Sequence, residues 1–466
     1  MRVLLISTYE LGRQPVHVAS PAGSLRRAGH EVAALDLAVE AWDDAKVEWA
    51  DAVAISVPMH TAMRLGAQVA ERLAVQRPGT PIAFYGLYAP VSRSRTLGRL
   101  ADRLLAGEFE PGLLAWVGEL AAGRVPFGEG LVVHLGASDL AVPDRSVLPP
   151  LERYAHLEVL GERRLVGAVE ASHGCSERCR HCPVPAVYDG RTRVVGVDLV
   201  MADIDQLVGL GARHVTFADP DFLSGPRHAF RVVDELARSF PGLTFDVTTK
   251  VAHVLRHADR WDAVAAAGCL FVVSAVETLD DRVLALLDKG HTAADAARAV
   301  SLLASRGIDA HPSFLPFTPW TTPGSVLDIL DFVAAHGLVP VVDPVHYALR
   351  LLIPEGSLLL GVAELAPHLD AYDDDALTWR WRAGDPAVDE LQIALSAVVE
   401  EGAVGGEPPG QVYPRVREVV AAAAGRPEHT DVPAGTDLDG AGRPRLSEPW
   451  FCCAEPTAPQ FDALRI

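Results

Sequence analysis

The sequence contains no run of about 20 apolar residues, the length that a membrane-spanning helix needs. Its apolar N-terminal stretch, residues 3–6, is followed soon by Glu10 and Arg13, so it is too short for the core of a secretion signal. We therefore expect a cytoplasmic protein with no membrane partner, in which this stretch forms a buried strand.

Lysine is scarce in this chain of 466 residues, occurring only as Lys46, Lys250 and Lys289. The 41 basic residues are outnumbered by 61 acidic ones, which gives a formal net charge of −20. Because such an excess of negative charge repels phosphate backbones, the composition argues against a nucleic-acid partner. An apolar share of 49% is typical of a globular protein.

Cysteine is also scarce, and its six positions are 175, 179, 182, 269, 452 and 453. In a long chain without a secretion signal, so few cysteines indicate metal or redox chemistry in a reducing compartment rather than a disulfide framework. Cys269 lies in the apolar run 265–273 and is predicted to be a core residue.

The pattern of residues 1–125 predicts an open doubly wound α/β domain. Short apolar runs at 3–7, 32–37, 52–57 and 82–85 alternate with amphipathic helices, as in parallel strands covered on both faces. Ligands of such sheets bind at the carboxyl ends of the strands. The loops at these ends are residues 8–15, 58–60 and 86–89.

The rest of the chain is predicted to hold a linker, a second α/β domain and an accessory region. Residues 126–163 show no sustained period and are interpreted as a linker. Six βα units in residues 164–360 predict a (β/α)6 partial barrel, short of the eight units of a complete barrel. Residues 361–466 form the C-terminal accessory region. The expected strands of the barrel are 166–171, 214–218, 244–248, 270–275, 308–315 and 339–345.

Three cysteines, Cys175, Cys179 and Cys182, follow the first strand of this barrel. Three thiolates leave one iron of a four-iron cluster without a protein ligand, so that iron can bind a substrate or cofactor. A closed zinc site completed by His173 or His181 is the alternative. The position at the carboxyl end of a strand, where barrels carry their chemistry, favours the iron–sulfur site.

The spacing Cys-x3-Cys-x2-Cys and the barrel resemble the radical S-adenosylmethionine (SAM) superfamily, whose motif has an aromatic residue before the last cysteine. His181 occupies that place. The resemblance implies a [4Fe-4S] cluster that binds SAM and cleaves it reductively to a radical that attacks a small-molecule substrate. It also implies an electron donor such as a flavodoxin or ferredoxin.

The resemblance implies further SAM contacts, although ordinary polar residues at a barrel mouth are the alternative at each position. They lie after the second strand and on the fourth and fifth strands. These residues are Asp219, Asp221, Ser274, Glu277, His311 and Ser313.

The N-terminal domain resembles the cobalamin-binding domain of B12-dependent radical SAM proteins. The Asp-x-His-x-x-Gly motif of other cobalamin proteins is absent, so we expect no lower-face ligand from that motif. The alternative is an α/β domain used only for packing. The matching positions are Gly12, Gln14, Pro15, Ser56, Pro58, Met59, His60, Gly86 and Glu108.

The end of the chain, Trp-Phe-Cys-Cys-Ala-Glu-Pro, is similar to the tail of the CUAEP/CCAEP-tail radical SAM proteins. Cys452 and Cys453 are the catalytic residues that this resemblance predicts. Adjacent thiols can close a strained disulfide, clamp a soft ion or metalloid such as arsenic, or donate hydrogen to a radical. Two adjacent buried small residues without a chemical role are the alternative.

The sequence therefore predicts a radical SAM enzyme, with cobalamin-dependent methyl transfer as one subclass. Without cobalamin, we expect a tail-dependent reaction of sulfur, selenium or a metalloid. A non-catalytic zinc or iron–sulfur redox sensor is the hypothesis from another class.

Overall fold

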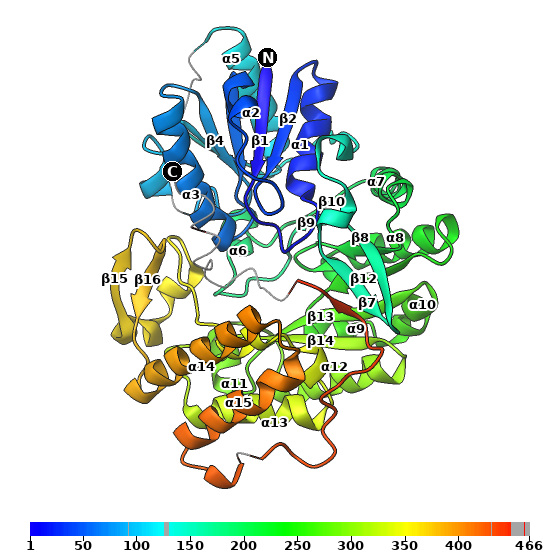
Figure 1. Ribbon diagram of the computed structural model, residues 1–466, viewed down its shortest axis with the longest axis vertical. Helices are drawn as coiled ribbons and strands as arrows, with labels where there is room; N and C mark the ends of the chain where they lie inside the picture. Colours follow the sequence, from blue (N-terminus) through cyan, green and yellow to red (C-terminus); the bar gives the residue numbers. More distant parts are fainter. Residues whose placement is uncertain (92, 125–129, 430, 449–460, 462–466) are drawn as a thin grey trace.

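The structure, a computed structural model, describes residues 1–91, 93–124, 130–429, 431–448 and 461 (Figure 1). Two sheets form its framework, and the N-terminal sheet (blue in Figure 1) lies above the second sheet in that view. Over these residues, no helix combines the length and apolar character that a membrane crossing requires.

The N-terminal sheet is parallel throughout and has the strand order β2-β1-β3-β4-β5-β6. Alternate residues of β1 enter separate apolar clusters on the two faces of the sheet, with Leu4 in one and Val3 in the other. The doubly wound prediction is therefore confirmed. The strands are β1 (Arg2–Ser7), β2 (Glu31–Asp36), β3 (Ala52–Ser56), β4 (Ile82–Tyr85), β5 (Arg103–Gly107) and β6 (Leu131–His134). The helices are α1 (Val16–Arg27), α2 (Asp44–Trp49), α3 (His60–Gln76), α4 (Arg93–Thr96) and α5 (Phe109–Ala121).

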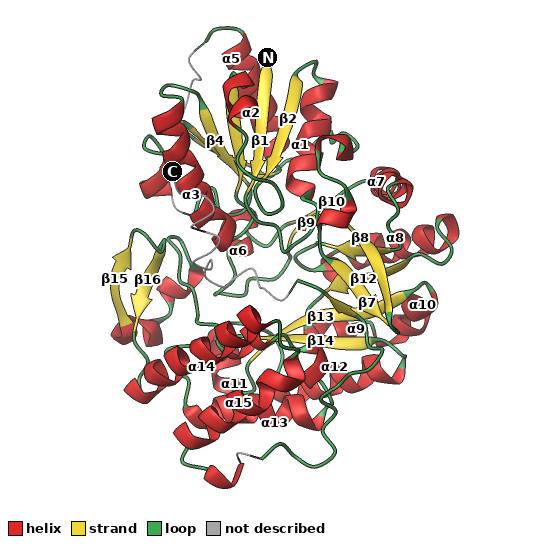
Figure 2. Ribbon diagram, viewed as in Figure 1, coloured by secondary structure: helices red, strands yellow, loops and turns green. Residues whose placement is uncertain are grey.

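The second sheet has the order β14-β13-β12-β11-β8-β7-β17 and forms the predicted partial barrel (Figure 2). Its five strands from β8 to β14 are parallel, whereas β7 and β17 are antiparallel additions at the β8 edge. The strands are β7 (His156–Val159), β8 (Glu162–Val169), β11 (His214–Phe217), β12 (Thr244–Thr248), β13 (Cys269–Glu277), β14 (Asp309–Phe314) and β17 (Arg445–Leu446). The covering helices are α7 (Val197–Gly209), α8 (Pro226–Ser239), α9 (Val251–Arg256), α10 (Trp261–Ala266), α11 (Asp281–Leu286), α12 (Ala293–Ser305) and α13 (Pro323–Ala335).

The prediction of a strand at residues 339–345 is wrong. This segment forms two 3-10 turns, η5 (Val339–Val341) and η6 (Pro344–Tyr347). Pro340 and Pro344 lack the N–H groups that a ladder needs, which explains why an apolar run does not extend here. The sixth unit is reduced to one parallel bridge between Phe317 and Arg350.

The expected linker, residues 126–163, contributes a strand to each of the two sheets in its described part. β6 extends the N-terminal sheet and β7 extends the barrel sheet. Between them, buried Arg145 donates from Nε to Asp203 Oδ1 (2.8 Å) and from Nη2 to Ala168 O (2.6 Å). This ion pair ties the connection to α7 and β8.

The C-terminal region closes the open side of the partial barrel. A hairpin of β15 (Leu369–Asp373) and β16 (Thr378–Trp381) precedes α14 (Pro386–Gly405) and α15 (Pro409–Ala423). α15 lies against α13, and Tyr413 donates to Leu330 O (2.8 Å). The chain then returns as β17 beside β7. Arg443 pairs with Asp309 of β14 (2.8 Å) and Arg445 pairs with Asp343 (2.7 Å), so two ion pairs fasten β17 to the far side of the barrel.

Replacing Arg145 with alanine is expected to lower the free energy of unfolding by about 3–5 kcal/mol, because the buried Asp203 carboxylate loses its partner. Equilibrium urea unfolding measures this change. The matched control is Arg380→Ala, which removes an exposed guanidinium paired with Asp373 and should lower the free energy of unfolding far less. Equal losses in the two variants would contradict the prediction.

Candidate functional site

The cysteine loop lies at the carboxyl edge of the second sheet, between the two sheets (Figure 1). It begins after the short strand β9 (Ser172–Gly174), which pairs with β10 (Thr192–Val194), and it runs into α6 (Val184–Tyr188). Gly174 has a φ of +74°, and a Cβ there would lie 2.3 Å from Arg191 O. Only glycine allows the turn that leads into Cys175.

The three predicted ligands are free thiols that lie near enough to influence one another's pKa. Cys175 and Cys179 are buried, and Cys182 is half-buried. Burial raises the pKa of Cys175 and of Cys182 to about 12, and the neighbouring thiols add to the effect. Cationic iron would reverse this shift, because a metal deprotonates the thiols that coordinate it. Three clustered thiols without a disulfide fit a cluster with one open iron.

The closed zinc site has no ligand set among the described residues. Within that part of the chain, no three His, Cys, Asp or Glu side chains converge closely enough to hold a single metal ion. The two histidines considered as fourth ligands instead face carboxylates. His173 Nδ1 lies 3.0 Å from Glu108 Oε1, and His181 Nε2 lies 3.1 Å from Glu277 Oε1.

Asp219 and Asp221, predicted from the second strand, both lie beside the cysteine loop. Asp219 accepts from the N–H of Ala171 (3.0 Å) and the hydroxyl of Ser172 (2.6 Å), which fixes the start of β9. Burial raises the pKa of Asp219 to about 7. Asp221 Oδ2 lies 3.8 Å from Cys175 Sγ, so this carboxylate contacts a predicted cluster ligand.

Asp221 is held by residues that the sequence analysis missed. Thr249 donates its hydroxyl to Asp221 (2.7 Å), and His253 Nδ1 lies 2.8 Å from the same carboxylate. His253 and Lys250 also contact Glu177 of the cysteine loop, and the Lys250 Nζ–Glu177 Oε2 distance is 3.0 Å. The segment after β12 therefore holds the cysteine loop in place through Asp221 and Glu177.

Glu277, predicted from the fourth strand, forms a second anchor for the loop. It contacts His181 and accepts from Lys289 Nζ (3.0 Å). Burial opposes its ionisation, but the charges of Lys289 and His181 more than offset burial and hold the pKa of Glu277 well below its usual range. Its φ of +68° follows a register shift between β13 and β14. Non-glycine residues held in this region are concentrated at functional sites.

The scarcity of lysine could have identified two of the missed residues. Lys250 and Lys289 account for two of the three lysines in the chain, and both are buried beside the cysteine loop. Buried lysines are rare unless they are paired, so each lysine after a predicted strand or helix was a candidate. Their partners, Glu177 and Glu277, are 73 and 12 positions away.

The other three predicted SAM residues occupy different surfaces of the barrel. Ser274 lies two residues from Val272 and two from Val276, and residues at this spacing share one face of a strand. Because both valines pack toward the helices, Ser274 lies on the outer face of β13. His311 and Ser313 share the opposite face of β14. His311 stacks on Phe271 with a centroid distance of 4.3 Å, and burial lowers its pKa to about 3. It is therefore a neutral side chain within the barrel.

A chain of acidic and histidine side chains joins the cysteine loop to the N-terminal sheet. His173 contacts Glu108 and Glu170, and Glu170 lies 3.6 Å from His17 Nε2. His17 in turn lies 3.3 Å from Glu10. Although burial disfavours a charged imidazole, the flanking carboxylates raise the pKa of His17 to about 9 and that of His173 well above its usual range. Glu108 was predicted and His173 was considered as a zinc ligand, whereas the further members of this chain, Glu170 and His17, were missed.

The predicted loops of the N-terminal domain lie at the carboxyl edge of its sheet, as expected. Gln14 is buried and donates to Pro149 O (2.9 Å), and Pro15 precedes α1. Ser56 ends β3, and Pro58, Met59 and His60 lead into α3, with His60 buried against Tyr88. Gly86 has a φ of +115° and approaches Val57, where a Cβ would lie 3.1 Å from the backbone.

Two atoms of the β1–α1 loop fit a polar ligand at this edge. Glu10 Oε2 and Arg13 Nε are buried and have no hydrogen-bond partner among the residues that the structure describes. Buried polar groups are normally paired, so this acceptor and this donor each indicate room for a polar partner in the loop. Primary amides, which line the rim of a corrin ring, offer both functions. The residues present are therefore compatible with cobalamin.

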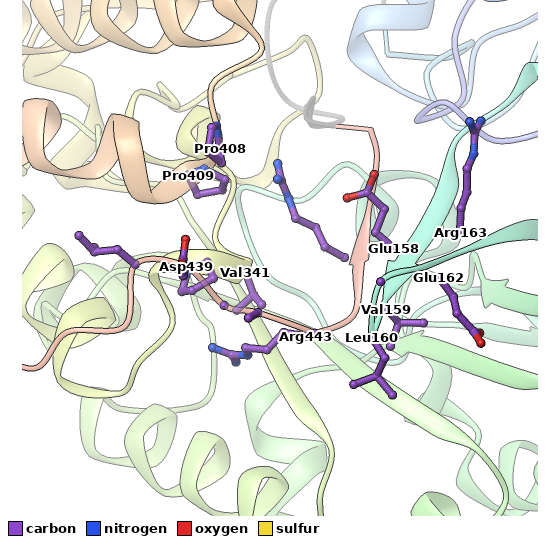
Figure 3. Close-up of a pocket in the computed structure, with 17 residues that line it drawn as sticks. Glu158, Val159, Leu160, Glu162, Arg163, Val341, Pro408, Pro409, Asp439 and Arg443 are labelled. Carbon is purple, nitrogen blue, oxygen red and sulfur yellow. The ribbon is translucent and has the colours of Figure 1, made fainter.

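A pocket of about 370 Å³ lies elsewhere, at the amino edge of the barrel (Figure 3). The turn between β7 and β8, with Leu160 and Glu162, forms one wall, and Asp439 and Arg443 form another. Since β8 runs from this turn toward the cysteine loop, the pocket is at the opposite end of the strands. It is not part of the candidate site.

Residues 169–333 match the family model of the Radical SAM superfamily. This segment of the chain is a radical SAM domain. This match begins at the end of β8 and includes the cysteine loop, Asp219, Asp221 and Glu277. It confirms the family that the cysteine spacing predicted.

Other comparisons concern single relatives. A hopanoid C-2 methylase from Rhodopseudomonas palustris (strain TIE-1) is 22% identical over 175 residues, which are 36% of this chain and 33% of the methylase. The chain thus spans about a third of the length of this curated relative.

Two solved structures share the overall fold. The radical SAM methyltransferase TsrM from Kitasatospora setae, with tryptophan and a SAM analogue bound, has a TM-score of 0.61 at 18% identity, covering 79% of this chain and 78% of TsrM. The cobalamin-dependent radical SAM enzyme OxsB, with aqua-cobalamin and SAM bound, has a TM-score of 0.64 at 14% identity, covering 86% of this chain and 67% of OxsB.

The Cys175→Ala variant is expected to lose the cluster, because two thiolates cannot hold it. After anaerobic reconstitution, iron analysis should give about four irons per wild-type chain and a small fraction of that for the variant. The matched control is Cys269→Ala, which removes a buried thiol of β13 outside the loop. Full iron content in Cys175→Ala, or equal loss in Cys269→Ala, would contradict the assignment.

Proposed function

We propose that this radical SAM enzyme transfers a methyl group to a small molecule with the help of cobalamin. The observation that carries the proposal is the direct apposition of the cysteine loop and the carboxyl edge of the N-terminal sheet. Leu87 and Ala106 of that edge belong to one apolar cluster with Cys175 and Cys182. Two cofactor sites at facing edges suit a reaction that needs both groups.

The residues of this chain have separable tasks in the proposed reaction. When bound, the cluster supplies the electron that cleaves SAM, and cobalamin supplies a methyl carrier. Cys175, Cys179 and Cys182 would hold the cluster, while Asp221 and Glu277 keep their loop in place. The apolar contact with the N-terminal sheet excludes water, which strengthens every charge interaction beside it.

Cobalamin binding by this chain is supported by the edge of the N-terminal sheet. Glu10 Oε2 and Arg13 Nε offer an acceptor and a donor, and Gly86 permits close approach to the backbone. TsrM and OxsB, which share the fold, are described with cobalamin bound. We propose residues 1–125 as the cobalamin domain, 126–163 as its connection, 164–360 as the SAM barrel and 361–466 as the accessory region.

We further propose that Cys452 and Cys453 act on the substrate. Both lie outside the described residues, but the residues on either side of their segment are described. Glu448 accepts from the Tyr9 hydroxyl (3.2 Å), and Phe461 packs on the N-terminal domain with Arg64 5.0 Å from its ring centroid. Both anchors lie on the domain proposed to bind cobalamin. Tail-dependent sulfur, selenium or metalloid chemistry is the alternative if cobalamin does not bind.

The reconstituted enzyme is expected to retain one equivalent of cobalamin and to release 5′-deoxyadenosine from SAM after reduction. Optical spectra report the cobalamin, and chromatography with mass detection reports the nucleoside. Iron and 5′-deoxyadenosine without cobalamin would refute the methyl-transfer part and favour the tail-dependent reaction. Zinc without 5′-deoxyadenosine would indicate a sensor and refute the whole proposal.

The Cys452→Ala variant should keep the cluster and cleave SAM, but form no product, because the proposed thiol acts after the radical forms. Iron content and 5′-deoxyadenosine serve as internal references, and Cys269→Ala is the control for loss of an unrelated thiol. If Cys452→Ala also lost iron, the tail would be a cluster ligand and the proposed role would be wrong.

A further inference from the structure

The cysteine loop reaches solvent on one flank only partly covered by other elements. The N-terminal sheet covers the side of Cys175 and Cys182 that faces Leu87 and Ala106. On the other flank, Ser176 and Arg178 are exposed, although each is the sequence neighbour of a buried cysteine. A partner docked on this flank would therefore touch residues that directly adjoin two of the three cysteines.

This flank is positively charged in a chain whose net charge is −20. Four exposed arginines, which we call the arginine face, lie on the cysteine loop, at β10 and on the first turns of α8. They are Arg178, Arg191, Arg227 and Arg231. The acidic side chains exposed on the same elements are Asp189, which pairs with Arg178 (2.6 Å), and Asp234.

Hydrogen bonds and close contacts join these elements into one surface. Ser224, just before α8, accepts from the backbone N–H of Ser176 (2.8 Å) and shares a hydrogen bond with Thr192 (2.7 Å). A Cβ at Gly190 would lie 3.7 Å from Arg178, and one at Gly225 would lie 3.7 Å from Val194. Val194 is 55% exposed and adds an apolar element to the surface.

We propose that the arginine face docks an acidic electron-transfer protein that carries a one-electron flavin or iron–sulfur group. This inference rests on the proposed radical SAM function. In the docked complex, one electron would pass from the reduced donor to the cluster that the three cysteines would hold, and no bond would be formed or broken. Opposite charges steer such encounters and set their rate more than their final affinity. An acidic chain needs a local positive surface to attract an acidic donor.

The test compares a protein donor with a small reductant. Arg191→Glu and Arg227→Glu are combined, because among the described residues neither side chain forms a hydrogen bond or ion pair with the cysteines or their anchors. With a photoreduced acidic flavodoxin, the rate of 5′-deoxyadenosine formation per donor concentration should fall roughly tenfold or more at low salt. With dithionite, the rate should equal that of the wild type.

Ionic strength and a matched variant complete the test. Raising the salt should bring wild type and variant together, because screening removes the steering. Arg213→Glu carries the same charge change on an exposed residue at the amino end of β11, and it should behave as wild type.

Three results would overturn the inference. They are an unchanged flavodoxin rate in the double variant, an equal loss with Arg213→Glu, and a wild type that reacts with dithionite but not with flavodoxin. A wild type that releases no 5′-deoxyadenosine even with dithionite would instead refute the proposed function.

Discussion

The central constraint on this molecule is that the three cysteines proposed to bind the cluster must be held in place at the carboxyl edge of a parallel sheet. Loops at such edges have no ladder to fix them, so other groups must do so. Here the Glu277–Lys289–His181 contacts hold one side and the Asp221–His253 contacts hold another. Burial makes these ion pairs costly to break, because each would leave an unpaired charge.

The same loop explains how the two domains meet. The Glu108–His173 and Glu170–His17 contacts continue the ion-pair network from the loop to α1, and an apolar cluster lies beside them. Residues at the carboxyl edge of the N-terminal sheet are therefore in direct contact with the residues that precede Cys175. The arginine face occupies the flank that this contact leaves open.

Local sequence signals predicted much of this arrangement. Both doubly wound and barrel strands are visible as apolar runs, and the Cys-x3-Cys-x2-Cys spacing located the loop and its position after β8. The sequence could not show that residues 339–345 turn, because their apolar run resembles a strand until the two prolines are weighed. It also could not pair Lys250 with Glu177 or His17 with Glu170, since these partners meet only after the chain folds. The periodicity of apolar residues did not reveal β6 and β7, because both are short strands near the edges of their sheets.

The central claim is that the three cysteines hold a cluster whose open iron binds SAM. The most direct measurement is electron paramagnetic resonance of the reduced, reconstituted enzyme before and after SAM is added. The account predicts a four-iron signal whose g-values shift with SAM, because SAM becomes a ligand of the iron that lacks a cysteine. A reduced cluster whose spectrum does not change with saturating SAM would contradict it.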